Sequence, residues 1–531
     1  MAAPNAPNVA VKGALTVGHW EAPHKGVLRD FPPYKLAPDS LYDCLNVVFR
    51  NGELQPRPGM VQLSPTDLGA RVTGATQEST LASGAFEPTA FENTAFLTTA
   101  NADGTIVVAG TNKKFWAYFG GTWHDITNSP LTATDTYLAQ FTTIQIGSTV
   151  FVLLTNGIDA PRSWDNVSAT CATIAGTPPL FTDWTTASDR VIGVVPPYLI
   201  QWGNALNIST WPALNFRVLS DTTDTLVAIE NLGTLGVAVY KRRSIWIGTA
   251  QGGLDSSFFS FQLRGQFEGP ANPNSLVNVN GAHYYQTKTG RIGVFDGVTH
   301  TWINDGILPL ISGVIDINNM QRAFGVYDPI QREVWFYFPT LADNTSTTGN
   351  ISGVCVVTLP HPFSYEGVFF HSCYLGKTAI PVTAGTDRRL DVGDRIIFGQ
   401  NSGKNLAYLQ QSGISDDGVS FTGFFQTPPQ MTKDGDIAQA IGVETYGMYG
   451  GGQGPLTLRL GASPMLGNLT TTGFSTGVVL DLTVEPTLAP DLGAFSSLDQ
   501  FRGRFFSCRY EFASPVTFHY YGSRLMGTKV Q

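Results

Sequence analysis

Apolar and polar residues alternate in short runs through the middle of the chain, from about Val72 to Gln410. Alternation with a period of two predicts β-strands that bury one face. The runs come in pairs separated by Gly, Asn or Asp, which predicts β-hairpins, and Asn156-Gly157 fits a type I′ turn because both residues tolerate positive φ. The paired runs are KKFWAYFGGTWHDI, VFVLLTNGIDAPRSWD, LIQWGNALNISTW, AVYKRRSIWIGTAQGG, YYQTKTGRIGVFDGVTHTWI, FGVYDPIQREVWFYFP and RIIFGQNSGKNLAYLQ.

These hairpins recur with a spacing of roughly 40 to 60 residues, close to the length of one β-propeller blade. A blade is a small sheet that cannot bury both faces alone, so blades stack around a common axis. A set of β-sandwiches would give similar local patterns, because the repeats are degenerate. We therefore predict an all-β protein with a β-propeller of six to eight blades over residues 66–411, and keep sandwiches as the alternative.

The N-terminal residues 1–65 differ from this middle region. They are rich in proline, which interrupts both helices and central strands, and they predict an extended arm. One short helix is predicted inside the arm, with Asp39 or Ser40 as its N-cap. Its apolar residues fall at i, i+3, i+4 and i+7, namely Leu41, Cys44, Leu45 and Val48.

The spacing of the hairpins changes again after about Ser412. Strands there alternate up to the C-terminal segment FRGRFFSCRYEFASPVTFHYYGSRLMG. A separate C-terminal β-domain is predicted over residues 412–531. Its clearest period-two pattern sets Val516, Phe518 and Tyr520 against Thr517, His519 and Tyr521.

Composition and charge narrow the functional classes. The 531 residues include 57 Gly, 32 Pro and 11% aromatic residues, which favours strands and tight turns. A net charge of −9 without a run of Lys or Arg argues against a protein that grips nucleic acid through its phosphates. The densest basic cluster, Lys241, Arg242 and Arg243, is interpreted as a solvated turn, with a subunit contact or a phosphate contact as alternatives.

Cysteine usage and apolar runs bear on the cellular compartment. The five cysteines are an odd number without a CxxC pair, so we interpret them as small buried apolar residues. The first residues lack the basic start and apolar block of a secretory signal. No apolar run approaches the roughly 18 residues of a membrane span. We expect a soluble protein that is made in the cytoplasm.

Motifs for catalysis are weak. GFSTG, residues 473–477, matches a nucleophile elbow, but the strand-like VVLDLTV follows it and His519 is the only later histidine. SDDGVSF, residues 415–421, approaches the turn motif of sialidase propellers, but its Gly stands one place early. The eight histidines show no metal-binding spacing, and no P-loop or G-x-G-x-x-G between strand and helix is present. We predict no catalytic, cofactor-binding or metal-binding residue.

Several blocks together resemble a known family. LAPDSLYDCLNVVFRNGELQPRPG, VAVYKRRSIWIGTAQGG, NPNSLVNVNGAHYYQTKTGRIGVFDG, GVYDPIQREVWFYFP and GRFFSCRYEF follow one another in the order seen in the tail nozzle proteins of short-tailed bacteriophages. These podovirus proteins are also called tail tubular protein B or packaged-DNA stabilisation proteins. The matching positions are structural signatures: Asn46, Gly52, Arg57 and Gly59 in the arm; Lys241, Arg243, Ser244 and Ile245 in the basic strand; Ser275, Gly290, Phe295, Asp296 and Gly297 in the hairpin; Asp328 and Trp335 in the next pair; Arg509 and Tyr510 near the C-terminus.

The resemblance implies a structural protein of the virion tail, synthesised in the cytoplasm of the bacterial host. Its copies would form a homohexamer below the tail adaptor, the head-to-tail connector ring, and extend the channel through which double-stranded DNA passes during ejection. Tail fibre, spike or needle proteins would be further partners. An acidic subunit suits such a passage, because negative walls repel DNA. A receptor-binding or fibre-attachment propeller is the alternative, followed by a glycan-active propeller enzyme.

Overall fold

The computed structural model describes residues 15–529 with gaps. The residues it leaves out within that span are 30–31, 51, 63–67, 80–104, 112, 120–121, 135, 254, 344–349, 361–370, 389–394, 401–406, 411–414, 433–434, 452–455, 464–473, 475–477, 481–486, 489–501 and 514–516.

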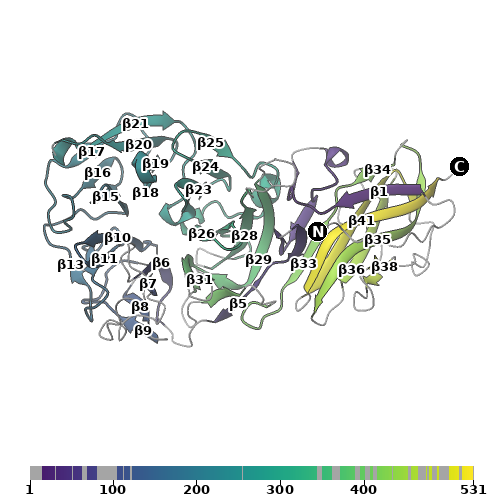
Figure 1. Ribbon diagram of the computed structural model, residues 1–531, viewed down its shortest axis with the longest axis horizontal. Coiled ribbons are helices and arrows are strands. Elements are labelled where there is room, and N and C mark those ends of the chain that lie inside the picture. Colours follow the sequence, from purple (N-terminus) through teal and green to yellow (C-terminus); the bar gives the residue numbers. More distant parts are fainter. Residues whose placement is uncertain are drawn as a thin grey trace, which may run out of the picture.

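Seven four-stranded antiparallel sheets form a β-propeller, visible as the ring of labelled strands on the left of Figure 1. The first four blades are β6 (Val72–Ser79), β7 (Thr105–Thr111), β8 (Phe115–Phe119) and β9 (Thr122–Asp125); β10 (Gln140–Ile146), β11 (Thr149–Thr155), β12 (Arg162–Trp164) and β13 (Ala172–Thr173); β14 (Asp183–Ala187), β15 (Arg190–Val195), β16 (Leu199–Trp202) and β17 (Phe216–Val218); and β18 (Leu226–Asn231), β19 (Val237–Lys241), β20 (Ile245–Ala250) and β21 (Phe259–Gly265).

The other three blades complete the ring. They are β22 (Leu276–Val279), β23 (Ala282–Gln286), β24 (Ile292–Phe295) and β25 (His300–Trp302); β26 (Phe324–Asp328), β27 (Glu333–Phe338), β28 (Ile351–Thr358) and β29 (Ser372–Val382); and β30 (Ala384–Arg388), β31 (Arg395–Gly399), β32 (Ala407–Gln410) and β5 (Gly59–Gln62).

The first strand of each blade lies innermost. These strands contact their neighbours around the ring, and β30 of the seventh blade contacts β6 of the first, so the ring is closed. The seventh blade takes its outer strand, β5, from the N-terminal part of the chain. The predicted propeller of six to eight blades is confirmed, with seven blades.

The C-terminal β-domain consists of two sheets that face each other. One sheet contains β1 (Leu15–Glu21), β3 (Val47–Arg50), β4 (Glu53–Pro56), β35 (Ala438–Gly451), β38 (Thr487–Leu488), β39 (Arg502–Gly503) and β41 (Thr517–Lys529). The other contains β2 (Asp43–Leu45), β33 (Thr422–Gln426), β34 (Gln430–Met431), β36 (Leu456–Ser463), β37 (Val478–Leu480) and β40 (Phe505–Ala513). Four of these strands, β1 to β4, come from the N-terminal arm, and Figure 1 shows purple β1 beside yellow β41.

The helix predicted around Leu41–Val48 is wrong. The segment forms β2 and β3 instead, and Asn46 between them has a φ of 59°. Leu41, Cys44 and Val48 are buried as expected, but they are buried in an extended chain. Pairing of β2 with β33 and of β3 with β4 overrides the helical spacing of these residues.

Helical structure is sparse in the part of the chain that is described. The one α-helix there is α1 (Leu308–Val314), with Pro309 in its first turn. Short 3-10 turns lie at Pro33–Lys35, Gly233–Leu235, Asp255–Ser257, Pro273–Ser275 and Met320–Arg322. None of the described helices combines the length and the apolar character needed to cross a bilayer.

The largest hydrophobic core joins the two domains. Inside the sandwich, the Phe425 ring stacks on Tyr510 with centroids 4.7 Å apart and contacts Tyr520 of the facing sheet at the same distance. The same core continues into the fifth and sixth blades, where it includes Tyr284 and Phe336. The period-two pattern predicted for the C-terminal strand is confirmed at Phe518 and Tyr520, which are buried, whereas Val516 lies outside the described residues.

Candidate functional site: the domain junction and the propeller axis

The chain passes between propeller and sandwich through two segments that lie side by side. One segment is Arg57-Pro58, between β4 and β5, and the other is residues 415–421, before β33. The Met60 amide donates to the Ser415 carbonyl at 3.0 Å, and the Asp417 amide donates to the Met60 carbonyl at 2.6 Å. These bonds make the two crossings a short parallel bridge at the centre of the junction.

A buried ion pair ties the two crossings together. Arg57 and Asp416 are 1% and 0% exposed, and both terminal nitrogens of the guanidinium donate to the carboxylate, at 2.9 and 2.6 Å. The remaining donors of Arg57 bind Oδ1 of Asn46 at 2.9 Å and the carbonyls of Pro58 and Lys377 at 2.9 and 3.0 Å. Because a buried charge is stable only with its partners in place, this cluster holds the junction in one geometry.

Asn46 connects the cluster to the sixth blade. Its Oδ1 also accepts from the Lys377 amide at 2.7 Å, and its Nδ2 donates to the Thr422 carbonyl at 2.7 Å. Asparagine tolerates the left-handed φ of 59° at this position better than most residues. Gly59 is required because the two crossings approach closely, since a Cβ atom at this position would lie 2.1 Å from the Ser415 carbonyl oxygen. Gly52 has a φ of 86° in the turn between β3 and β4.

A second buried ion pair joins the arm to the sixth blade. Arg50 of β3 donates through Nε and one terminal nitrogen to the two oxygens of Glu333 in β27, at 2.8 and 2.7 Å. The Trp335 indole also donates to Glu333, at 3.0 Å. Nearby Asp328 caps the β26–β27 turn by accepting from the amides of Ile330 and Gln331, while its burial raises its pKa to about 6.

The basic cluster at the β19–β20 turn is not one continuous positive surface. Lys241 is buried, and its ammonium group donates to the carbonyls of Leu219 and Thr222 at 3.0 and 2.9 Å. Ser244 is also buried and donates to Asp224 at 3.0 Å. Only Arg242 and Arg243 of this cluster expose their side chains. The solvated-turn interpretation therefore fits these two arginines, and Lys241 has a structural role.

The hairpin residues of the fifth blade also shape turns. Ser275 forms a reciprocal capping box with Asn272. Burial raises the pKa of Asp296, but the hydrogen bonds that its carboxylate accepts from the amides of Val298 and Thr299 and from the Thr299 hydroxyl together outweigh burial, so its pKa is lowered. Gly290 and Gly297, with φ of 86° and 92°, leave room for neighbouring side chains. Ile245 and Phe295 are buried in the core between the fourth and fifth blades.

The two C-terminal motif residues belong to the sandwich. Tyr510 is fully buried, and its hydroxyl lies 2.9 Å from the Thr445 hydroxyl. The Arg509 guanidinium lies 3.6 Å from the centroid of the Phe424 ring, and its Nε donates to Glu511 at 2.9 Å. The motif residues therefore divide between three places: the junction, the turns of the fourth to sixth blades, and the sandwich.

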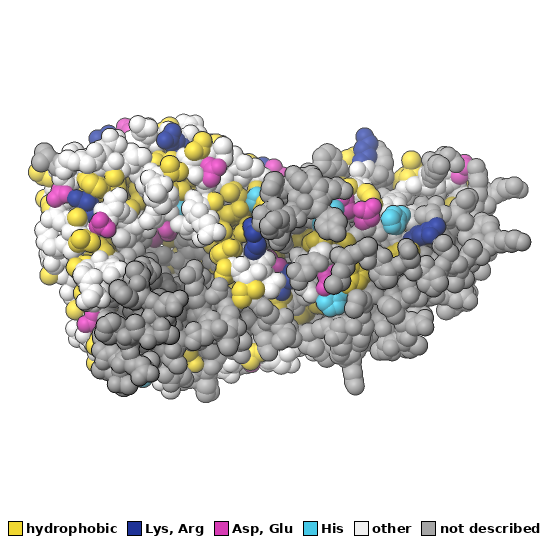
Figure 2. All heavy atoms as spheres, viewed as in Figure 1, with side chains coloured by type: hydrophobic (Ala, Val, Ile, Leu, Met, Phe, Trp, Pro, Cys, Tyr) yellow, Lys and Arg dark blue, Asp and Glu magenta, His cyan; other side chains and the backbone are white. Residues whose placement is uncertain are grey.

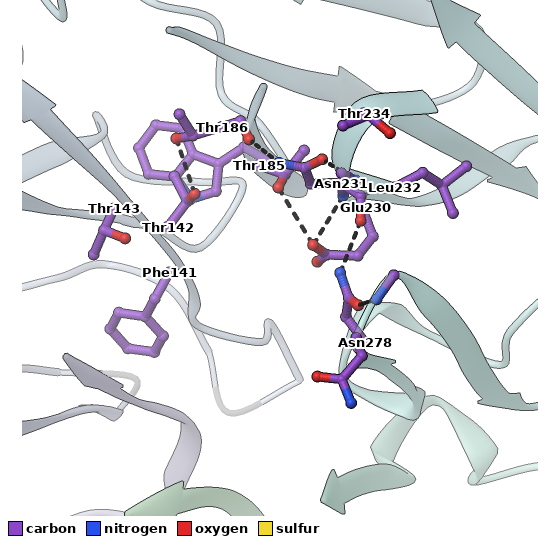
Figure 3. Close-up of a pocket in the computed structure, with 14 residues that line it drawn as sticks. Phe141, Thr142, Thr143, Thr185, Thr186, Glu230, Asn231, Leu232, Thr234 and Asn278 are labelled. Atoms are coloured by element: carbon purple, nitrogen blue, oxygen red, sulfur yellow. Dashed lines mark hydrogen bonds between the residues drawn. The ribbon is translucent and has the colours of Figure 1, made fainter. Parts of the chain in front are cut away.

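A polar cavity lies at the propeller axis and is drawn in Figure 3. Its wider part has a volume of about 700 Å³ and lies between residues of β10, β14 and β18 and the β22–β23 turn. Its narrower part, about 160 Å³, is lined by residues of the innermost strands of all seven blades. Phe141, Trp184 and Glu230 line both parts. At ~30 Å³ per water molecule, the narrow part holds only a few waters.

The weak catalytic motifs take structural roles or lie outside the described residues. In SDDGVSF, the first aspartate is Asp416, the partner of Arg57. Ser475 of GFSTG lies outside the described residues, and His519 contacts Glu53. All five cysteines are free and buried, as predicted. Among the described residues, no group of three or more His, Cys, Asp or Glu side chains could hold a metal ion.

Charged side chains are dispersed on the face of the molecule shown in Figure 2. Lys and Arg appear there singly, with Asp and Glu between them. Sequence reasoning missed the two carboxylates that hold the junction, Asp416 and Glu333, and the polar cavity at the axis. The local signal for Asp416 is the acidic SDD turn before β33, a sequence that also approaches the sialidase turn motif.

Comparisons with known proteins identify no family. No family model matches the chain, and no curated protein matches it. Among solved structures, the computationally designed protein Ika8 aligns at 12% identity and a TM-score of 0.36, over 66% of this chain and all of that one. A chain of a mitotic checkpoint complex aligns at 12% identity and a TM-score of 0.36, over 72% of this chain and 98% of that one.

Proposed function

We propose that the chain is a structural subunit of a bacteriophage tail nozzle. Six copies would close into a ring below the tail adaptor and extend the channel for DNA, and fibre, spike or needle proteins would dock on that ring. The proposal starts from the order of the sequence blocks that resemble this family. A repeated heterologous contact is the usual way in which copies of one chain close into such a ring.

The observation that carries the proposal is the buried junction. The arm residues of the resemblance, Asn46, Arg57 and Gly59, meet Asp416 where the chain passes between its domains. A continuous core and two buried ion pairs make propeller and sandwich one elongated body. A subunit that forms a wall needs this rigidity, because a hinge between the domains would change the bore of the ring.

The passage for DNA would lie between copies of the chain and not within one propeller. The narrow part of the axial cavity has a volume of only about 160 Å³, far too small for a duplex. The net charge of −9 per chain favours a wall that repels the phosphate backbone. The basic cluster at residues 241–243 adds little positive surface that could hold DNA, because Lys241 is buried and only Arg242 and Arg243 of this cluster reach solvent.

Electron microscopy of the full chain mixed with purified adaptor rings tests the proposal. We expect the rings to gain a second, coaxial layer with sixfold symmetry. Adaptor rings alone and the chain alone are the controls for ring stacking and self-association. If the chain leaves the adaptor rings unchanged at micromolar concentrations of both proteins, the nozzle function is refuted.

A further inference from the structure

The axial cavity has the chemistry of a site for a small polar ligand. Its wider part has a volume of about 700 Å³, within the roughly 300–1,000 Å³ typical of ligand pockets. Threonine hydroxyls, asparagine amides and one carboxylate supply most of its polar lining. None of the described residues that line either part is Lys, Arg or His. An anionic ligand would therefore meet no compensating charge there.

Glu230 lies where the two parts of the cavity meet. Its Oε1 accepts from the Asn231 amide at 2.9 Å and from the Thr185 hydroxyl at 3.5 Å. Burial raises its pKa, and no cation among the described residues pairs with it. Asp183, in the narrow part, also has a raised pKa because it is buried, and the charge of Glu230 raises it further. Two such carboxyl groups favour a ligand that donates hydrogen bonds and carries no negative charge.

Some hydroxyls at the cavity wall are available to a ligand. The hydroxyls of Thr142 and Thr186 lie 3.2 Å apart, and each keeps further hydrogen-bonding capacity. Thr143 and Thr234 make no side-chain hydrogen bond to any residue that the structure describes, and Figure 3 shows them without dashed lines. Each hydroxyl can donate and accept, which matches the hydroxyls of a sugar.

We propose that this cavity, which we call the axial saccharide site, binds a neutral hydroxyl-rich saccharide. Hydroxyls of the sugar donate to Glu230 and exchange hydrogen bonds with the available hydroxyls of Thr142, Thr143 and Thr186. The apolar face of a sugar ring packs on Phe141, which lines both parts of the cavity. The site goes beyond the nozzle function, since it requires neither ring formation nor DNA. It is a binding site, and no bond of the ligand is broken in it.

Saturation-transfer NMR with the full chain tests the site. The probes are maltotriose and triacetylchitotriose as neutral trisaccharides, sialyllactose as an acidic one, and spermidine as a cation. We expect at least one neutral trisaccharide to bind with a dissociation constant on the order of 1 mM or below, and sialyllactose to bind at least about tenfold more weakly. If spermidine binds and neither neutral sugar does, the cavity is a cation site and the proposal is refuted. The proposal is also refuted if neither the neutral sugars nor spermidine bind.

Two substitutions locate the binding. Thr143→Val removes a hydroxyl without a described protein partner and keeps the shape, so it should weaken the sugar roughly fivefold and leave the melting temperature unchanged. Glu230→Gln should weaken it by about tenfold or more, because a hydrogen bond to a charged group is lost. Thr301→Val, on the exposed outer strand of the fifth blade, is the matched control and should leave binding unchanged. Equal binding by wild type and the Thr143→Val and Glu230→Gln variants would place the sugar elsewhere and refute the site. Thr143→Val remains decisive if Glu230→Gln fails to fold.

Discussion

Breaking the Arg57–Asp416 pair tests whether the junction holds the two domains together. In Arg57→Met, the Asp416 carboxylate stays fully buried and keeps the Ala379 amide, at 2.6 Å, as a described hydrogen-bond donor to its side chain. Removal of one partner of a buried ion pair costs about 3–5 kcal/mol. Asn46 also loses the bond from the Arg57 Nε. We therefore expect a loss of about 4 kcal/mol in the free energy of unfolding, at the middle of that range.

Guanidinium denaturation followed by tryptophan fluorescence measures this loss. The matched control is Lys114→Met, which breaks the exposed pair of Lys114 and Asp125, whose side chains are 46% and 34% exposed. Such a surface pair contributes about 1 kcal/mol or less. The double variant Arg57→Met/Asp416→Asn should recover part of the loss, because no unpaired charge stays buried. If Arg57→Met costs no more than Lys114→Met, the junction does not depend on the ion pair and our argument for a rigid subunit fails.

Three further predictions concern single residues. Asn46→Gly and Asn46→Ala both lose the side-chain hydrogen bonds of Asn46, but only Ala is strained by the left-handed backbone. Thermal melts should therefore show the Ala variant to be less stable than the Gly variant by about 1 kcal/mol. Equal melting temperatures of the two variants would show that the backbone conformation at this position is unimportant. The pKa of Asp328 is raised to about 6 from 3.8, so its contribution to stability is greatest below pH 4 and is lost as the pH rises to 6. In urea titrations, the free energy of unfolding of Asp328→Asn should rise relative to wild type by up to roughly 3 kcal/mol between pH 4 and pH 7. A difference between the two proteins that does not depend on pH would refute the shift. Gly59→Ala should destabilise the protein in denaturant titrations because its Cβ atom would meet the Ser415 backbone, while Gly313→Ala, in α1 with no atom near its Cβ position, should be neutral or stabilising by up to about 1 kcal/mol; the reverse order would show that the close approach at Gly59 is unimportant.

Local patterns were sufficient to predict the propeller. Strands β23 and β24 are an example, since apolar residues lie on either side of Gly290 and predict a hairpin there. The turn between the two strands requires the positive φ of Gly290. Such hairpins depend on neighbours in the sequence, so the sequence shows them directly. The Asn156-Gly157 turn was less predictable. Gly157 has the expected positive φ of 75°, but Asn156 does not, and its side chain instead caps the loop by accepting from the amides of Ile158 and Asp159.

Distant pairing could not be predicted in the same way. Arg57 pairs with Asp416, which lies 359 positions away in the sequence, and Arg50 pairs with Glu333, which lies 283 positions away. The residues next to each arginine in the sequence do not indicate which carboxylate it pairs with. The spacing of Leu41, Cys44 and Val48 fits a helix, and only the long-range pairing of β2 with β33 makes the segment extended. The axial cavity could not be predicted for the same reason, because Thr143, Glu230 and Asn278 come together only when the second to fifth blades pack around the axis.

The N-terminal arm supplies strands to both domains, so its residues lie in the cores and at the junction of both. Strands β1 to β4 belong to the sandwich, and β5 is the outer strand of the seventh blade. Closure of the ring therefore has to wait for β32, some 350 residues later in the chain, and the sandwich has to wait for β33 to β41. Contacts of such separation form slowly, because loop-closure entropy opposes them until the pairing is made. The Arg57–Asp416 pair lies where both closures meet, so its charges become buried only when each domain has received its N-terminal strands. A fragment of residues 66–411 would lack β5 and leave the seventh blade with an open edge, and the arm is therefore part of the folding unit of both domains.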